Sequence, residues 1–282
     1  KQTLLVIMYP SDNTLETVQV TGQKIQSGLL QNLKKTDLQN LNSGANSNTV
    51  EKLVQLQSGV STHSEFSSQY NVRGGSFDEN SIYINGNEIY RPFLIKCGQQ
   101  EGLSVISPYM VENIDFSNGG FTAKYGDKMS SVLDITYKKP EKFESVVSAS
   151  LMSADAYIGF GNKKFSWTNS FRYNNNRFLL NSLETSGEYR PNFTDYQTYF
   201  SYRPNSKWSF DIIGNYNSNH YNFYPKTRET TFGTMDNVKS FNVYFDGQEN
   251  DIFKTTSATF GITRQFSPSS SISLIASSFT SN

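Results

Sequence analysis

The side chains that most often carry out chemistry in enzymes are few in this chain and are not spaced for it. There are two histidines, His63 and His220, far apart in the sequence, and one cysteine, Cys97. None of them lies in a G-x-S-x-G, H-E-x-x-H or P-loop motif, each of which fixes a reactive group or a phosphate on one local turn or helix. One cysteine also leaves no disulfide framework and no thiolate metal cluster. We therefore predict that the chain is not an enzyme, and we expect no metal and no cofactor.

Asp78, Glu79 and Asn80 carry oxygen atoms of the kind that calcium prefers. Three consecutive residues cannot all point at one ion in a strand, and the EF-hand spacing is absent. The sequence favours a solvated turn here over a calcium site.

The tripeptide Arg73-Gly74-Gly75 raises a choice between a nucleic-acid-binding loop and a structural turn. The chain has 25 Lys and Arg residues against 25 Asp and Glu residues, and so no net charge. Nucleic-acid-binding domains usually carry a basic patch that neutralises phosphates, and no basic block occurs here. We predict no nucleic-acid partner.

The elements around these residues mix helix and strand signals. The stretch "NSNTVEKLVQLQSGV" predicts a short helix with Asn48 as N-cap, Glu51 as its capping-box partner and Gly59 as the stop. "SPYMVENIDF" predicts a helical turn capped by Ser107 that passes into a strand, and residues 131–137 predict a further strand.

A hairpin is predicted in "SIYINGNEIY". Asn85-Gly86 stands between two runs of β-branched and aromatic residues, and a type I′ turn needs positive φ at both turn residues. Counting outward, Ile82 faces Ile89 and Tyr83 faces Glu88. The first half of the chain is therefore expected to form a compact α+β unit.

The second half of the chain differs in composition. Residues 143–282 contain 28 aromatic residues, against 12 in residues 1–142. In "KFSWTNSFRY", "WSFDIIGNY" and "SATFGITRQF", aromatic and aliphatic residues alternate with polar ones at a period of two, which indicates strands.

The connections between these strands also alternate. "GNKK", "RPNSK" and "SPSS" are short, whereas residues 174–191 and 217–240 are long and polar. Short turns at one end and long loops at the other are typical of an outer-membrane β-barrel, so we favour a barrel over a soluble β-sandwich. The sequence lacks the roughly 20 consecutive apolar residues of a membrane helix.

Three stretches in order over residues 14–140 resemble the plug of TonB-dependent outer-membrane transporters. "LETVQVTGQ" is similar to the TonB-box region, "YNVRGGSFDENSIYINGNEIYRP" to the plug segment with an Arg-Gly pair before a hairpin, and "VENIDFSNGGFTAKYGDKMSSVLDITYKKP" to the closing plug signature. The sequences of the last two stretches look most like those of transporters of Bacteroidota.

The resemblance implies an all-β transmembrane barrel, 22-stranded in the full protein with about seven strands here, and an N-terminal α+β plug. We expect residues 1–13 to end a preceding carboxypeptidase-regulatory-like β domain, 14–22 to form the TonB-box region, 23–140 the plug and 141–282 the first part of the barrel. The chain opens in what looks like the middle of a strand, "TLLVIMY", so we expect it to be a fragment.

The resemblance also implies a function, namely TonB-dependent active import of a nutrient of the siderophore, vitamin, glycan or peptide class across the bacterial outer membrane. The alternative is a structural or accessory subunit of an outer-membrane complex. Partners would be TonB with ExbB and ExbD, outer-membrane lipid and, as a further option, a surface lipoprotein or other complex subunits. The plug and N-terminus would face the periplasm.

Site residues follow from the same resemblance. The TonB-binding residues would be Glu16, Thr17, Val18, Gln19 and Val20, which suit capture by strand addition, although the segment could also be an ordinary edge strand or linker. Arg73 would latch the plug to glutamates on the barrel wall, the alternative being a solvated arginine. Substrate contacts are expected from plug and outer loops, at Arg91, Phe93, Tyr221, Phe223 and Tyr224. For the tyrosines, an aromatic girdle at the membrane interface is an equal alternative.

Overall fold

The computed structural model describes residues 31–33, 37–38, 49–62, 68–89, 104–122, 124–127, 129–175, 187–190, 192–225, 228–234, 237–244 and 247–282. The expected regions 1–13 and 14–22, with Glu16 to Val20, lie outside the described residues, as do Arg91 and Phe93.

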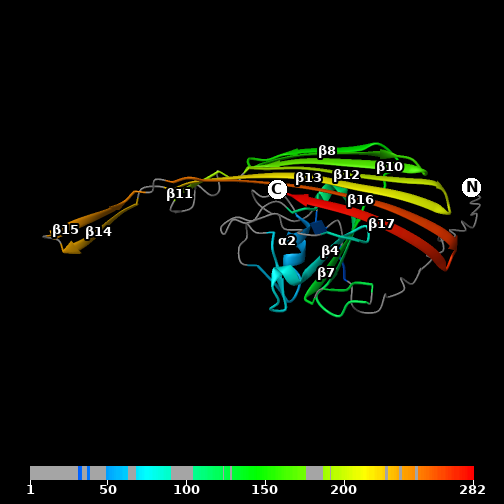
Figure 1. The fold of residues 1–282 in the computed structure, drawn as a ribbon, viewed down its shortest axis with the longest axis horizontal. Coiled ribbons are helices and arrows are strands. Elements are labelled where there is room, and N and C mark those ends of the chain that lie inside the picture. Colours follow the sequence, from blue (N-terminus) through cyan, green and yellow to red (C-terminus); the bar gives the residue numbers. More distant parts are fainter. Residues whose placement is uncertain are drawn as a thin grey trace, which may run out of the picture.

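Two layers make up the molecule (Figure 1). A small α+β unit, coloured blue to green and ending with strand β7 (Ser131–Tyr137), lies against one face of a long curved sheet that runs from β8 (Glu144–Ala149) to β17 (Ser270–Ser281). We call these parts the small unit and the large sheet.

The small unit is built on a five-stranded sheet in the order β1-β6-β7-β4-β5. Strands β4 and β7 run parallel, and the other neighbours run antiparallel. The predicted strand at 131–137 is confirmed as β7. The other strands are β1 (Gln31–Leu33), β4 (Asn80–Ile84), β5 (Asn87–Glu88) and β6 (Val111–Ser117), and a separate pair consists of β2 (Val60–Ser61) and β3 (Asn71–Val72).

Helix α2 (Val50–Gln55) begins one residue later than predicted. Thr49 has an extended backbone and its Oγ1 accepts a hydrogen bond from the Lys52 backbone N–H at 3.3 Å, so Thr49, not Asn48, is the N-cap. This shift places Glu51 at the second helical position, where it cannot complete a capping box, and its side chain is buried instead. The helix also ends at Gln55, before Gly59.

The predicted hairpin is confirmed. Asn85 and Gly86 have φ of +51° and +78°, and the Ile89 N–H donates to the Ile82 carbonyl at 2.8 Å. Asn85 also ties the turn to β7, because its Oδ1 accepts from the Tyr137 N–H at 2.9 Å. The turn is therefore held at the end of β7 from which the chain continues to β8.

The predicted turn at Ser107 is a 3₁₀ helix, η2 (Pro108–Met110), that leads into β6; a second one, η1 (Phe77–Glu79), precedes β4. Residues 78–80 thus turn directly into a strand, but the solvated turn is only partly present. Asp78 is exposed, whereas Glu79 accepts a hydrogen bond from the Ser130 hydroxyl and Asn80 is buried. The Ser107 side chain does not cap η2 and has another partner.

Seven antiparallel strands form the path of the large sheet, which agrees with the expected number of barrel strands in this chain. Strand β11 (Gly187–Tyr189) pairs with β13 off this path. The remaining strands are β9 (Ser153–Gly161), β10 (Phe165–Asn174), β12 (Asn192–Asn205), β13 (Trp208–Pro225) and β16 (Glu249–Ser267).

The short connections are confirmed, and one long loop is not. Residues 162–164, 206–207 and 268–269 are tight turns. By contrast, residues 217–240 are largely strand, because β13 stays paired with β16 as far as Phe223 opposite Glu249. Beyond it a separate hairpin, β14 (Arg228–Thr234) with β15 (Asn237–Val243), projects far from the small unit (Figure 1).

On strand β10 of the large sheet, aromatic side chains are exposed and polar ones are buried, which is the reverse of the pattern in a soluble protein. In β10 the aromatic side chains of Trp167 and Phe171 are 41% and 46% exposed, while the polar Thr168 and Ser170 between them are buried. The polar face is the covered one because the small unit packs against it. The hydrophobic core continues into the large sheet through Tyr157, Tyr199 and Ile213.

No helix in the part of the chain that the structure describes is long and apolar enough to cross a membrane.

Candidate functional site

The covered face of β10 and β12 holds a set of buried polar side chains. A strand in contact with an apolar core would normally present apolar groups, so buried polar groups here need hydrogen-bond partners across the interface. Those that form hydrogen bonds to the small unit or to each other are Ser170, Arg172, Asp195 and Gln197.

Arg172 reaches from the large sheet into the small unit. Its Nε and Nη2 donate to Asp195 Oδ2 at 2.9 and 2.6 Å, and the pair is almost fully buried. Its Nη1 donates to the Ile106 carbonyl at 2.9 Å and its Nη2 to the Ser104 carbonyl at 2.6 Å. One guanidinium thus fastens two backbone carbonyls of segment 104–107 to the large sheet, and the planar fork of arginine suits this geometry.

Gln197 makes a second set of bonds beside Arg172. Its Oε1 accepts from the Ser107 N–H at 3.2 Å and from the Tyr137 hydroxyl at 3.1 Å, and its Nε2 donates to the Val105 carbonyl. The hydroxyls of Ser107 and Ser170 lie 2.6 Å apart. Segment 104–107 is therefore held along its length by the inner face of β10 and β12.

Glu51 approaches the same segment from helix α2. Its side chain is fully buried, and the Ser104 hydroxyl donates to its Oε1 at 2.5 Å. The pKa of Glu51 is raised from 4.5 to about 7, because burial raises it by more than the bonds with Ser104, Thr49 and its own backbone and the charge of Arg172 lower it. We call this set of residues, Glu51, segment 104–107, Arg172, Asp195 and Gln197, the junction.

A second attachment lies where the chain passes from β7 to β8. Lys139 forms an ion pair with Asp211 of β13 at 3.2 Å, and the Tyr199 hydroxyl donates to the same carboxylate oxygen at 2.7 Å. Burial lowers the pKa of Lys139, against the raising effect of Asp211. The linker is thus tied to the large sheet both covalently and by charge.

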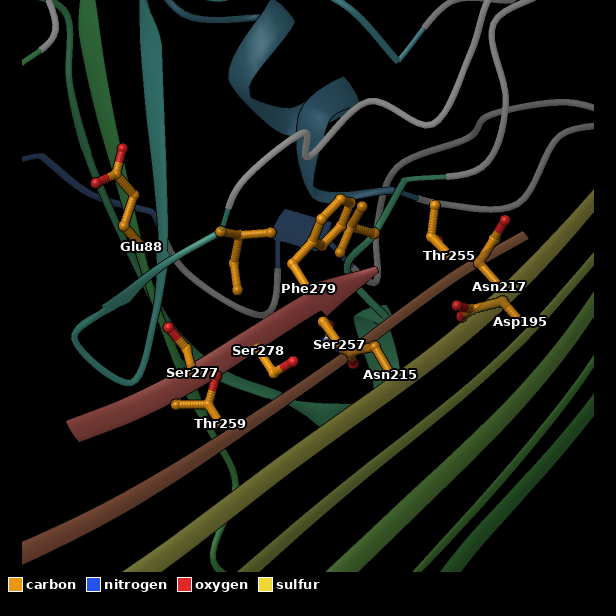
Figure 2. Close-up of a pocket in the computed structure, with 12 residues that line it drawn as sticks. Glu88, Asp195, Asn215, Asn217, Thr255, Ser257, Thr259, Ser277, Ser278 and Phe279 are labelled. Atoms are coloured by element: carbon orange, nitrogen blue, oxygen red, sulfur yellow. Dashed lines mark hydrogen bonds between the residues drawn. The ribbon is translucent and has the colours of Figure 1, made fainter. Parts of the chain in front are cut away.

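The interface between the small unit and the large sheet also contains two cavities. A cavity of about 40 Å³ lies between the edge strand β5 and strands β13, β16 and β17 (Figure 2). Its wall is mostly hydroxyl and amide side chains, among them Asn215, Asn217, Ser257 and Ser277, with Phe279 beside them. A larger hollow of about 750 Å³ lies between the Asn85-Gly86 turn and strands β12, β13, β16 and β17, and the side chains of the Lys139 attachment line part of it.

The three aromatic residues proposed for substrate contact do not form one group. Tyr221 and Phe223 lie two residues apart on β13 and so share a face, opposite Asp251 and Glu249 of β16. Tyr224 points to the other face, where the Arg190 guanidinium lies 4.8 Å from its ring centre. Their role as substrate contacts stays a prediction.

Arg73 is exposed in the part of the chain that the structure describes. Its backbone has φ of +50°, and its Nη2 lies 3.5 Å from Asn118 Oδ1 of the small unit. A latch from Arg73 to further barrel strands stays a prediction. The buried arginine that joins the two parts of this structure is Arg172, one of the polar residues that alternate with aromatic ones in "KFSWTNSFRY".

The junction cannot be recognised from the sequence pattern alone. Arg172, Asp195 and Gln197 sit at polar positions of alternating strands, and such positions look the same whether they face water or another domain. The available signal was charge in mid-strand, since Asp155, Arg172 and Asp195 are all charged and stand opposite one another across three strands. Within the described residues, no group of three or more His, Cys, Asp or Glu side chains is placed to hold a metal ion.

Comparison with known families identifies the small unit. Residues 16–132 match the family model of the TonB-dependent receptor plug domain. No curated protein is similar enough in sequence to count as a match.

Solved structures resemble the whole arrangement. The outer membrane transporter YddB from Escherichia coli is 10% identical with a TM-score of 0.57, over 84% of this chain and 37% of that one. The copper transporter OprC is 11% identical with a TM-score of 0.57, over 90% and 37%. A mutant of the ferric enterobactin receptor PfeA from Pseudomonas aeruginosa is 12% identical with a TM-score of 0.50, over 89% and 45%.

The chain thus spans less than half the length of each of these three structures. At these identities the likeness concerns the fold, and it places the small unit as the plug and the large sheet as barrel wall. Residues 16–132 thus match the TonB-dependent receptor plug domain, and the chain as a whole shares its fold with part of these outer-membrane β-barrel proteins.

Proposed function

We propose that the complete protein imports a nutrient across the bacterial outer membrane by TonB-dependent active transport, without chemistry on its cargo. The plug family and the fold shared with two proteins described as transporters support this proposal. The outward aromatic face of the large sheet suits contact with lipid, and its polar inner face suits a plug.

The observation that carries the proposal is the junction. Buried hydrogen bonds to a charged group are strong, and breaking them without replacement costs several kcal/mol. Arg172 and Gln197 therefore hold the plug closed against the wall in the resting protein. A plug fixed in this way needs an external energy source to open, which is what coupling to TonB would supply.

Partners and orientation follow from this role. We propose that Glu16 to Val20 are captured by TonB, which works with ExbB and ExbD, and that the short-turn end of the wall and the N-terminus face the periplasm. A surface lipoprotein remains a further candidate partner, and an origin in Bacteroidota remains a prediction. The cargo class stays open among siderophore, vitamin, glycan and peptide.

Replacing Val18 with proline tests the coupling. Proline removes a backbone donor that strand addition to TonB would use, so retention of the full-length protein on immobilised TonB C-terminal domain should fall at least tenfold. Val18→Thr keeps both the donor and the β-branched shape and serves as the matched control. Equal retention of Val18→Pro and Val18→Thr would sink the TonB-box assignment.

The alternative, a structural subunit of an outer-membrane complex, also keeps the plug but needs no working TonB box. Growth of a Val18→Pro strain on defined iron, vitamin and glycan sources, compared with the deletion strain and the unaltered strain, separates the two. Import predicts that Val18→Pro matches the deletion strain on one source. Equal growth of all three strains on every source favours the structural role.

A further inference from the structure

Glu51 is the one fully buried acidic residue among those that the structure describes in the plug, and its position is unusual for a carboxylate. Its Oε1 has the Ser104 hydroxyl as partner, while its Oε2 is buried without a hydrogen-bond partner in the described residues. A buried carboxylate with an unsatisfied oxygen is costly to keep ionised.

Ser104 stands between Glu51 and the barrel wall. Its hydroxyl donates to Glu51, its Oγ accepts from the Ile106 N–H at 2.9 Å, and its carbonyl accepts from Arg172. Helix α2 and strand β10 therefore hold the same residue from opposite sides. Segment 104–107 is thus tied to the plug helix by Glu51 and to the wall by Arg172.

The charges around this point do not balance. Groups that face Glu51 are Tyr70 before β3, Tyr137 on β7 and Arg172 on β10. Arg172 is also shared with the carboxyl groups of Asp155 on β9 and Asp195 on β12. Three carboxyl groups thus surround one guanidinium, which favours a proton on one of them in the closed arrangement.

We propose that Glu51 is the positioning residue that ties helix α2 to segment 104–107. It holds this contact in its protonated form, and the junction opens with release of the Glu51 proton to water. The inference rests on the proposed function in one respect, namely that opening of the junction belongs to transport. In the closed state the carboxylic acid is neutral and buried; in the open state it is hydrated and ionised.

The sign of the pH effect follows from linkage. The folded pKa of Glu51 is raised, so its contribution to the closed state is fully present below the unfolded value and is lost as pH rises through the folded value. With a value of 4.5 in the open state and about 7 in the closed one, the opening equilibrium should grow about 30-fold between pH 5.5 and pH 8.5.

Hydrogen exchange of the purified full-length protein in detergent tests this, without TonB or cargo. Amides of α2 and of residues 104–110 are followed from pH 5.5 to 8.5, corrected for the intrinsic pH dependence of exchange. We expect the 30-fold rise in the unaltered protein and a change below about 3-fold in Glu51→Gln, which mimics the neutral acid.

Two control variants sharpen the test. Glu112→Gln removes an exposed acid of β6 and should keep the full pH profile. Ser104→Ala removes the donor to Glu51 but leaves the acid, so the junction should open more at every pH while the rise with pH persists. A purely structural role for Glu51 would change exchange equally at all pH values.

A flat profile in the unaltered protein, or a rise that survives in Glu51→Gln, overturns the proposal. If Glu51→Gln does not fold, the profiles of the unaltered protein and of Ser104→Ala decide the matter, since a flat profile in both overturns it. Failure here is distinct from failure of the proposed function: a protein that imports with a flat profile refutes only this inference, and one that shows the profile without importing refutes only import.

Discussion

Arg172 shows how one side chain can join two parts of a protein. It is a charged residue in the middle of a strand whose other face carries exposed aromatic rings, and it is buried because its partners come from both sides. An ion pair of this kind adds little to stability compared with apolar residues, but removing one partner leaves the other charge buried and unpaired.

Replacing Arg172 with alanine should therefore loosen the plug. We expect a loss of about 3–5 kcal/mol in the junction, because Asp195 and the carbonyls of Ser104 and Ile106 lose their donors. The measurement is passive vancomycin uptake in cells carrying the full-length protein, which should rise. Uptake should rise less in Arg172→Lys, because lysine keeps the positive charge but lacks the planar guanidinium group.

Arg264→Ala is the matched control for this experiment. Arg264 is an exposed arginine on the other face, stacked 5.1 Å from the Trp208 ring centre, and its loss should leave uptake unchanged. Equal uptake in the Arg172 and Arg264 variants would contradict a role of Arg172 in closing the plug.

At the scale of elements, the alternation of the large sheet assigns each strand residue to one of two surroundings. On β16, Phe260 is 43% exposed on the outer face, whereas its neighbour Thr259 lines the small cavity between wall and plug. The two residues are neighbours in the sequence, but their side chains lie on opposite faces of the wall.

Lysine at these two positions should have different effects. Phe260→Lys places a charge on the face proposed to contact lipid and should cost about 2–4 kcal/mol near the bilayer midplane, while Thr259→Lys keeps its charge in a polar space and should cost less than half of that. Urea unfolding of the full-length protein in lipid vesicles measures both. A larger loss for Thr259→Lys would reverse the assignment of inner and outer face.

At the scale of the whole molecule, the plug is attached unevenly. It is fastened to β10 and β12 by the junction and to β13 by Lys139 at the linker, and from these attachments the hollow spaces extend along β13, β16 and β17. If transport displaces segment 104–107, fixing that segment to the wall should block it.

A disulfide across the interface tests this displacement. The hydroxyls of Ser107 and Ser170 are 2.6 Å apart, so Ser107→Cys with Ser170→Cys, in a Cys97→Ser background, should form a disulfide on oxidation. We expect import in the oxidised double variant to fall at least tenfold and to return with reductant, with the cross-linked peptide verified by mass spectrometry. The two single variants control for the substitutions. Full import by the oxidised double variant would show that this segment stays in place during transport.

Several local features were predictable from the sequence because they depend on neighbours in the chain. The Asn85-Gly86 turn, the strand at 131–137 and the alternating strands of the second half follow from backbone preference and period, and all are present. The N-cap was misplaced by one residue because Asn48 and Thr49 are both good caps and only the geometry chooses between them. The long loop at 217–240 was misjudged because polar residues on a strand beyond the aromatic region look like loop residues.

By itself, the sequence determined the two-part organisation and the class of fold, since turn chemistry, strand period and the ordered plug motifs are local properties that survive in a linear reading. Only the tertiary structure decided which polar positions matter. Glu51, Ser104 and Arg172 are separated by 53 and 68 residues and meet because the plug packs onto the inner face of the wall. A polar side chain gains its role from the partner it is buried against, and that partner is set by how the two layers dock, which no local pattern specifies.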